Sequence, residues 1–292
     1  MKPLEYHAPH SLDEAIRLLA ANGAGAAPLG GGTDLIIQNR TGRREVLHMV
    51  DVKAIPELNV LAFDAKSGLR LGAAVTCAAI SEFAPIGLHY PALLEGAEMI
   101  GSMQIQSRAS VGGNVCNGSP AADTICPLIV LGALCVTRGP KGGREIPARD
   151  FMVGPGKTAL LPGELLVELR IPPPPANSAN AYLRFIPRNE MDIAVASAAA
   201  WIDYGPDRKT CADARIAIGA VGPTPIFVEE AGKALIGTRL DAAAVHAAGL
   251  ASREAARPID DVRGTVAYRR RLADVLTRRA IALAVARFKE SK

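Results

Sequence analysis

The sequence contains few residues of the kinds that build metal sites and disulfide frameworks. Its 292 residues include five histidines and five cysteines, and aromatic residues make up only 4% of the chain. The cysteines are odd in number and contain no close pair, which argues against a disulfide framework or a paired-cysteine zinc or iron–sulfur site. We expect buried thiols that behave as small hydrophobic side chains. They are Cys77, Cys116, Cys126, Cys135 and Cys211.

Histidine offers no clear metal site either. His7 and His10 are the closest pair in the sequence, and they could share a ligand face only if their segment were helical. Pro9 lies between them and argues against a helix. The sequence therefore predicts no metal site in this chain.

Long hydrophobic runs are also missing. One of the longest apolar stretches, residues 193–202, is too short to cross a bilayer. The first six residues contain a proline and a glutamate where an export signal requires an apolar block. We therefore expect a cytoplasmic protein without a membrane span.

The net charge of +4 comes largely from arginines near the C-terminus. Arg269 to Arg271 and Arg278 with Arg279 alternate with apolar residues at helical spacing, which favours the solvated face of a helix. A docking surface for an acidic partner is the alternative. No aromatic residues are interleaved with these arginines for base stacking, so we expect no nucleic-acid binding.

Two glycine clusters lie about eighty positions apart. Without Cβ atoms the backbone can approach an anion closely, and successive N–H groups can point at it. Glycine clusters can also simply turn corners. Two such clusters together indicate a dinucleotide whose pyrophosphate is held from both sides. The clusters are Leu29, Gly30, Gly31, Gly32, Thr33, Asp34, Leu35, and Ser110, Val111, Gly112, Gly113, Asn114.

Common nucleotide motifs do not fit these clusters. Residues 23–28 resemble the start of a Rossmann fingerprint, but they follow a predicted helix and lead into a strand, which is the reverse of the required order. Neither cluster is followed by the lysine of a P-loop. No Gly-x-Ser-x-Gly elbow or motif-placed pair of carboxylates is present. A chain that holds a dinucleotide without acid–base groups leaves the chemistry to the cofactor, and a flavin fits this description.

The predicted elements alternate between helices and strands. Ser11 and Glu14 form a capping box for a first helix that Asn22 and Gly23 can close, and Thr33 and Asp34 can cap another. The four prolines from Pro172 mark the best domain boundary. Strands are expected over residues 26–29, 46–52, 69–75, 134–137, 193–202 and 213–221, and helices over 35–38, 91–100, 121–131, after 225 and over 266–288.

Several ordered motifs resemble one known family. Gly31 to Leu35, Ser110 to Asn114, Asn117 to Asp123 and Met191 to Ala194 are similar to the FAD-binding medium subunit of molybdenum hydroxylases, which include xanthine dehydrogenase, carbon monoxide dehydrogenase and aldehyde oxidoreductase. Thr158 to Glu164 and Arg263 to Arg270 extend the resemblance over nearly the whole chain. Thr33-Asp34 and the segment from Asn117 to Asp123 favour the xanthine dehydrogenase branch.

The resemblance implies an α+β fold. It implies a vanillyl-alcohol-oxidase (PCMH)-type FAD-binding domain over residues 1–175, made of subdomains over about 1–55 and 56–175. A smaller C-terminal α+β domain over residues 178–292 would contain a three-stranded antiparallel sheet with helices.

The resemblance further implies an oxidoreductase of several subunits. A large subunit would hold molybdopterin and oxidise the substrate, and a small subunit would relay electrons through two [2Fe–2S] clusters to the FAD of this chain. The flavin would then reduce NAD, oxygen or a quinone, and the assembly would be a dimer of heterotrimers. A stand-alone flavin-dependent oxidase and a scaffold that has lost its flavin are the alternatives, and the substrate and the final acceptor stay open.

The resemblance also implies roles for individual residues. Leu29 to Leu35 and Ser110 to Asn114 would line the two sides of the pyrophosphate, and Asp123 would bind a polar end of the cofactor such as the ribose. Leu166 would pack on the flavin, and Arg184 would lie beside the isoalloxazine. Ile100 stands where some relatives place a phenylalanine over the flavin ring.

Two further features of the family bear on the cofactors. Neither glycine cluster contains a histidine, so the FAD would be bound non-covalently. Cys116 matches the first cysteine of a branch that carries a [4Fe–4S] cluster, but the cysteine-rich insertion of that branch is missing, so no cluster is expected.

Overall fold

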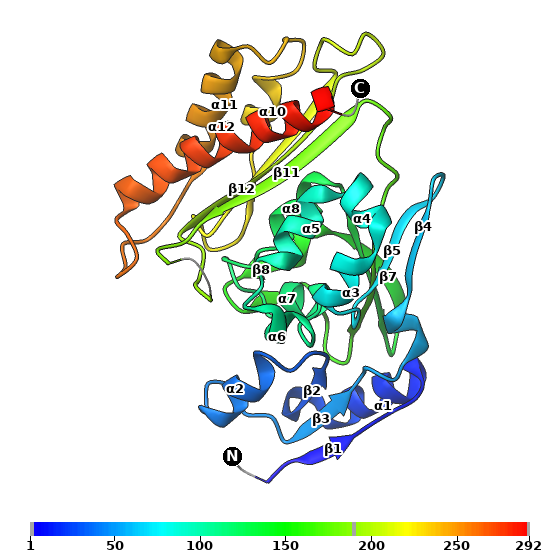
Figure 1. Ribbon diagram of the computed structural model, residues 1–292. Helices are drawn as coiled ribbons and strands as arrows, with labels where there is room; N and C mark the ends of the chain where they lie inside the picture. The colour runs from blue at the N-terminus through cyan, green and yellow to red at the C-terminus, as the bar shows by residue number, and fades with distance from the viewer. Residues whose placement is uncertain (1–2, 189–190, 291–292) are drawn as a thin grey trace.

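The computed structural model describes residues 3–188 and 191–290, and the chain runs through three successive layers (Figure 1). An N-terminal subdomain lies at one end, a middle subdomain follows, and a C-terminal domain lies at the other end. This mixed arrangement of helices and sheets is the α+β class that the resemblance implies.

The N-terminal subdomain is a small parallel sheet covered by a helix. Its strand order is β1-β3-β2, with both outer strands parallel to β3. The capping box is confirmed in part: Ser11 accepts a hydrogen bond from the Glu14 N–H at 3.3 Å, and Gly23 ends the helix with φ +51°. The elements are β1 (Glu5–His7), α1 (Leu12–Asn22), η1 (Gly23–Gly25), β2 (Ala26–Leu29), α2 (Leu35–Arg40) and β3 (His48–Asp51).

The middle subdomain is a five-stranded antiparallel sheet with helices packed on one face. Its strand order is β4-β5-β10-β6-β7. The main hydrophobic core lies between this sheet and its helices. The elements are η2 (Pro56–Asn59), β4 (Leu61–Asp64), β5 (Gly68–Gly72), α3 (Cys77–Glu82), α4 (Ala84–His89), α5 (Pro91–Glu98), α6 (Met103–Gln106), α7 (Val111–Cys116), α8 (Ile125–Val130), β6 (Leu134–Gly139), β7 (Gly142–Pro147), α9 (Ala148–Phe151), β8 (Met152–Gly154), β9 (Lys157–Thr158) and β10 (Leu165–Ile171).

The C-terminal domain is a four-stranded antiparallel sheet with the order β11-β12-β13-β14. Side chains alternate along β12, so Ala198 and Ala200 face the helices of this domain while Ala199 and Trp201 face the core of the middle subdomain. The elements are β11 (Ser178–Phe185), β12 (Ala196–Asp203), β13 (Asp213–Gly219), β14 (Ile226–Phe227), α10 (Glu229–Lys233), α11 (Ala242–Ala255) and α12 (Val266–Glu290).

This sheet differs from the expected three strands. Ile226 and Phe227 pair with Ile218 and Ala217 and so add a fourth strand of two residues. A strand this short leaves no alternating pattern in the sequence, and the helix expected after Pro225 begins only at Glu229. The helices expected over 91–100 and 121–131 are likewise shorter, because α5 ends at Glu98 and α8 begins at Ile125.

The C-terminal arginines have more than one role. Arg271 and Arg279 are exposed, as a solvated helix face requires. Arg269 is instead buried, and its guanidinium donates to the carbonyl oxygens of Val195 and Ala220 at 3.1 Å each and to Asp261 at 2.6 Å. The prediction of a uniformly solvated face is therefore wrong at Arg269, which holds α12 against the sheet.

The cysteines behave as the sequence predicts, with one exception. Cys77, Cys126, Cys135 and Cys211 are buried, whereas Cys116 is half-buried. Burial raises the pKa of Cys126 and of Cys116 to about 12, so both thiols stay protonated and unreactive. Within the described residues, no helix combines the length and the apolar character needed to span a membrane.

Candidate functional site

The two glycine clusters meet in space. A Cβ added at Gly31 would clash with the carbonyl oxygen of Arg108 and lie 2.9 Å from Cα of Ala109, and one added at Gly30 would lie 3.6 Å from Ser110 Oγ. The backbone after β2 therefore passes directly over the backbone that leads into α7. Only glycine at position 31 permits this approach.

The first cluster presents unused backbone N–H groups. Among the described residues, the N–H groups of Gly30, Gly31, Gly32 and Thr33 donate no hydrogen bond, and all four residues are half-buried. Gly32 has a positive φ of +77°, which turns the chain into α2. Successive N–H groups of this kind form a concave site for an anion.

Thr33 and Asp34 differ from their expected role as helix caps. Asp34 occupies the N-cap position of α2 but has helical backbone angles, and its side chain accepts no capping hydrogen bond. Asp34 is exposed, Thr33 and Leu35 are half-buried, and Leu29 is buried at the end of β2. The first turn of α2 is therefore left uncapped by its own side chains.

The second cluster is the first turn of a helix rather than a loop. Ser110 is the N-cap of α7, and its hydroxyl accepts a hydrogen bond from the Gly113 N–H at 3.1 Å. Val111 and Gly112 are buried, and a Cβ at Gly112 would lie 2.5 Å from the Ala73 carbonyl oxygen. The lack of a side chain at Gly112 therefore serves packing against Ala73, and its contact with a cofactor stays a prediction. Gly113 is exposed.

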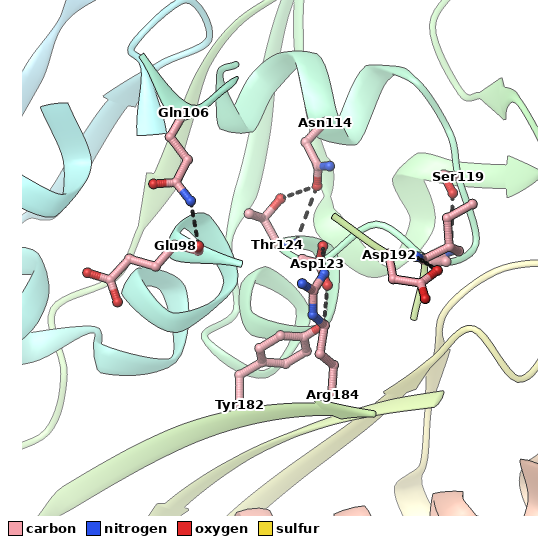
Figure 2. Close-up of polar contacts among 11 residues, drawn as sticks. Glu98, Gln106, Asn114, Ser119, Asp123, Thr124, Tyr182, Arg184 and Asp192 are labelled. Atoms are coloured by element: carbon pink, nitrogen blue, oxygen red, sulfur yellow. Dashed lines mark hydrogen bonds and ion pairs between the residues drawn. The ribbon is translucent and has the colours of Figure 1, made fainter. Parts of the chain in front are cut away.

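Asn114 connects α7 to the segment that carries Asp123 (Figure 2). Its side-chain oxygen accepts hydrogen bonds from the Thr124 hydroxyl at 2.7 Å and from the Thr124 N–H at 3.3 Å. Asn117 instead contacts α2, where its side-chain oxygen accepts a hydrogen bond from Gln38 Nε2 at 2.8 Å. These bonds fix both glycine clusters and Asp123 relative to one another.

Asp123 and Arg184 bind each other directly (Figure 2). Arg184 Nη1 lies 2.8 Å from Asp123 Oδ2, and the Tyr182 hydroxyl donates to Asp123 Oδ1 at 3.0 Å. Burial raises the pKa of Asp123 to about 6, although Arg184 and Tyr182 pull it down. Sequence reasoning placed these two residues at separate parts of a cofactor and missed Tyr182, whose side chain is fully buried.

One nitrogen of Arg184 has no partner within the described residues. The side chain is 7% exposed, and Nε forms no hydrogen bond. A buried N–H without an acceptor is unfavourable by about 1–3 kcal/mol. The Arg184 Nε–H and the N–H groups of residues 30–33 are therefore donors without acceptors among the described residues. A nucleotide with polar groups at both ends would supply acceptors for them.

Ile100 and Leu166 occupy different environments. Ile100 is half-buried beyond the end of α5 and packs against the main core. Leu166 on β10 is 1% exposed and belongs to that core. Leu166 therefore has no free surface in this structure, which differs from the expectation that it packs on a flavin.

Family models match both parts of the chain. Residues 2–174 match the FAD binding domain in molybdopterin dehydrogenase, and residues 181–284 match the CO dehydrogenase flavoprotein C-terminal domain. The first match alone covers more than half of the chain.

Similar proteins include dehydrogenase subunits of two branches. The carbon monoxide dehydrogenase medium chain of Afipia carboxidovorans is 36% identical over 98% of each chain. The putative xanthine dehydrogenase FAD-binding subunit XdhB of Escherichia coli K12 is 32% identical over 96% of each chain. The identity to the carbon monoxide dehydrogenase subunit is the higher of these two. The comparison therefore does not favour the xanthine dehydrogenase branch that the sequence motifs indicated.

Solved structures agree with this relationship. The reconstituted CO dehydrogenase from Oligotropha carboxidovorans superposes with a TM-score of 0.93 at 35% identity, over 98% of this chain and 100% of the other. Quinoline 2-oxidoreductase from Pseudomonas putida 86 has a TM-score of 0.89 at 28% identity, over 97% of this chain and 98% of the other. The chain belongs to the FAD-binding medium subunits of the molybdenum hydroxylases, which are subunits of oxidoreductases.

Proposed function

We propose that this chain holds one FAD non-covalently and passes electrons from the [2Fe–2S] clusters of a partner subunit to an external acceptor. The observation that carries the proposal is the meeting of Gly30 and Gly31 with the backbone of residues 108–110, beside four unused N–H groups. Bare amides that converge from two segments suit a diphosphate, which carries negative charge on several oxygens.

Individual residues would hold different parts of the cofactor. The N–H groups of residues 30–33 would bind the diphosphate from one side, and Ser110, Gly112, Gly113 and Asn114 would line the other. Asp123 and Arg184 would contact its polar ends, and the free Nε of Arg184 supports this assignment. Ile100 would contact the flavin edge. The bound flavin would supply the redox chemistry, since it can take electrons from one partner and give them to another.

The site supports electron transfer better than substrate chemistry on this chain. Asp123 is the buried acid of the site, and its two oxygens are occupied by Arg184 and Tyr182. A carboxylate held in this way is not free to act as a general base. Substrate oxidation would therefore take place on a large molybdopterin subunit, with a small iron–sulfur subunit between them, in a dimer of heterotrimers.

We also propose bounds for the domains that would enclose the cofactor. Residues 1–175 would form the FAD-binding domain, with subdomains over about 1–55 and 56–175, and residues 178–292 would form the C-terminal domain. The glycine clusters would come from the first two units and Arg184 from the last, so all three would enclose the cofactor.

Flavin content tests the binding site. Gly113 is exposed, so the bulky variant Gly113→Trp should fold but place an indole where the cofactor lies. We expect about one FAD per chain in the unmodified protein and little in the variant, measured by absorbance after denaturation. A variant with full flavin content would contradict the proposed site.

Electron transfer is tested with the co-purified partner subunits. Anaerobic mixing with the substrate of the complex should reduce the iron–sulfur clusters first and the flavin afterwards, followed at separate wavelengths by stopped-flow absorbance. Reoxidation by NAD, oxygen and a quinone would then identify the acceptor. Turnover of a small alcohol or aldehyde by the isolated chain would instead support a stand-alone flavin oxidase.

A further inference from the structure

Three side chains with metal-binding groups gather on the N-terminal sheet. Strands β1 and β3 lie side by side at the N-terminal end of the molecule (Figure 1). Glu5 of β1 lies opposite His48 of β3, and His7 lies two residues further along β1. Alternate residues of a strand point to the same face, and paired residues share a face. Glu5, His7 and His48 therefore project from one face of the sheet.

The distances between their ligand atoms match those around a tetrahedral ion. His7 Nε2 lies 3.3 Å from His48 Nδ1, and Glu5 Oε2 lies 3.4 Å from His48 Nδ1 and 3.7 Å from His7 Nε2. Zinc bonds of about 2.0–2.1 Å in a tetrahedron separate neighbouring ligand atoms by about 3.3 Å. An octahedral ion with bonds of that length would separate them by only about 2.9 Å.

The chemistry of the three groups also suits a cation. A neutral imidazole nitrogen without hydrogen and a carboxylate oxygen are both acceptors, and all three can donate a lone pair to a cation. A divalent cation satisfies all three at once. Two imidazoles with one carboxylate are a common ligand set for zinc, with water in the fourth position.

The surroundings hold the ligands in place while leaving access. The side chains of His7 and His48 are 24% and 23% exposed, and their rings stack at 5.6 Å with an interplanar angle of 20°. The Glu5 side chain is 71% exposed, so solvent can supply the remaining ligand. The imidazoles are therefore partly ordered before an ion arrives.

We propose that Glu5, His7 and His48 form a zinc site that ties β1 to β3. β1 is an edge strand of three residues, and such a short strand gains little from its own hydrogen bonds. An ion that binds only the folded arrangement stabilises it in proportion to its concentration and affinity. The sequence alone predicted no metal site, because His7 and His48 become adjacent only through strand pairing.

The zinc site lies away from the cofactor site. β2 and β3 run parallel, with Ala26 opposite His48 and Leu29 opposite Asp51. The first glycine cluster follows Leu29, so it lies at the other end of the strands, about 10 Å along them from His48. Zinc binding and flavin binding should therefore be independent, and each can fail without the other.

Calorimetric titration of Zn²⁺ into the chelator-treated full chain tests the site. We expect one equivalent to bind, and Co²⁺ in its place should give the intense visible bands of tetrahedral coordination in a difference spectrum. His7→Ala and His48→Ala should each weaken Zn²⁺ binding at least about a hundredfold, since even loss of an outer-shell partner weakens binding 10- to 100-fold. His10→Ala is the matched control, because His10 is exposed and outside the cluster, and should bind as the unmodified chain does.

The flavin content of each variant reports whether it has folded. If both histidine variants lost flavin and failed to fold, Glu5→Ala would decide, because its exposed side chain is dispensable for folding. This variant should bind Zn²⁺ at least about tenfold more weakly. The proposal is overturned by absence of stoichiometric binding to the unmodified chain, by unchanged binding in Glu5→Ala or the folded histidine variants, or by loss of binding in His10→Ala.

Discussion

Arg184 of the C-terminal domain forms an ion pair with Asp123 of the middle subdomain, with Nη1 and Oδ2 2.8 Å apart. The side chains of Arg184 and Asp123 are only 7% and 10% exposed, and Tyr182 beside Arg184 adds a hydrogen bond to the same carboxylate. The pair therefore joins two structural units at the place where we assign the cofactor. Removal of either partner would leave the other as a buried charge, a change that typically destabilises a protein by about 3–5 kcal/mol.

The burial of Asp123 predicts that its contribution to the stability of the chain falls as the pH rises. Burial raises the pKa of Asp123 from 3.8 to about 6, so the folded state binds a proton more tightly than the unfolded state. This contribution to stability is fully present below pH about 4 and is lost as the pH rises through about 6. The free energy of unfolding of the unmodified chain minus that of Asp123→Asn should fall over this interval, measured by urea denaturation. A difference that rises with pH would contradict the raised pKa.

The close approach of the glycine clusters predicts opposite outcomes at neighbouring positions. Gly31→Ala should lower the flavin content severalfold, because its methyl group would push the first cluster away from the carbonyl oxygen of Arg108. Gly30→Ala is the matched control, since its methyl group would make only an ordinary contact 3.6 Å from Ser110 Oγ. Flavin content per folded chain measures both. Equal loss in the two variants would show that the approach at Gly31 is not what shapes the site.

The two glycines of α7 should also differ in their effect on stability. Gly112→Ala forces a methyl group to within 2.5 Å of the Ala73 carbonyl oxygen and should destabilise the chain by about 1–3 kcal/mol. Gly113→Ala adds a methyl group at an exposed helical position and should change stability by no more than about 1 kcal/mol. Urea denaturation measures both changes. The reverse order would mean that Gly112 does not face the core.

The C-terminal arginines give a further matched pair. Arg269→Met removes hydrogen bonds to Val195, Ala220 and Asp261 and should destabilise the chain by about 3 kcal/mol. Arg271→Met alters an exposed residue of the same helix and should be within about 0.5 kcal/mol of the unmodified chain. Thermal denaturation of the two variants distinguishes a structural arginine from a solvated one.

Features that depend on neighbouring residues were predictable from the sequence. The strand over 26–29 has its predicted bounds, because a helix stop at Gly23 precedes it and the glycine cluster follows it. The meeting of the two clusters was also predicted, because two glycine clusters in one chain indicated a dinucleotide held from both sides. The family followed from several motifs in a fixed order.

Features that depend on distant pairing were not predictable. Asp123 and Arg184 are 61 residues apart, and His7 and His48 are 41 apart, so no local pattern connects either pair. The inward orientation of Gly112 depends on Ala73, which comes from another element. Turns and helix caps depend on neighbouring residues, so the sequence predicts them. Charge pairs form only when the folded sheets bring distant residues together, so the sequence does not.

The C-terminal sheet shares its inner face with the middle subdomain, where Tyr182 and Trp201 are part of the main core. The four prolines from Pro172 therefore mark a domain boundary in the sequence, although the main hydrophobic core continues across it. A fragment that ends there would expose the apolar surfaces of α5 and α8 to water and should aggregate. Production of this chain in two pieces would require both to be made together, as halves of a single folding unit.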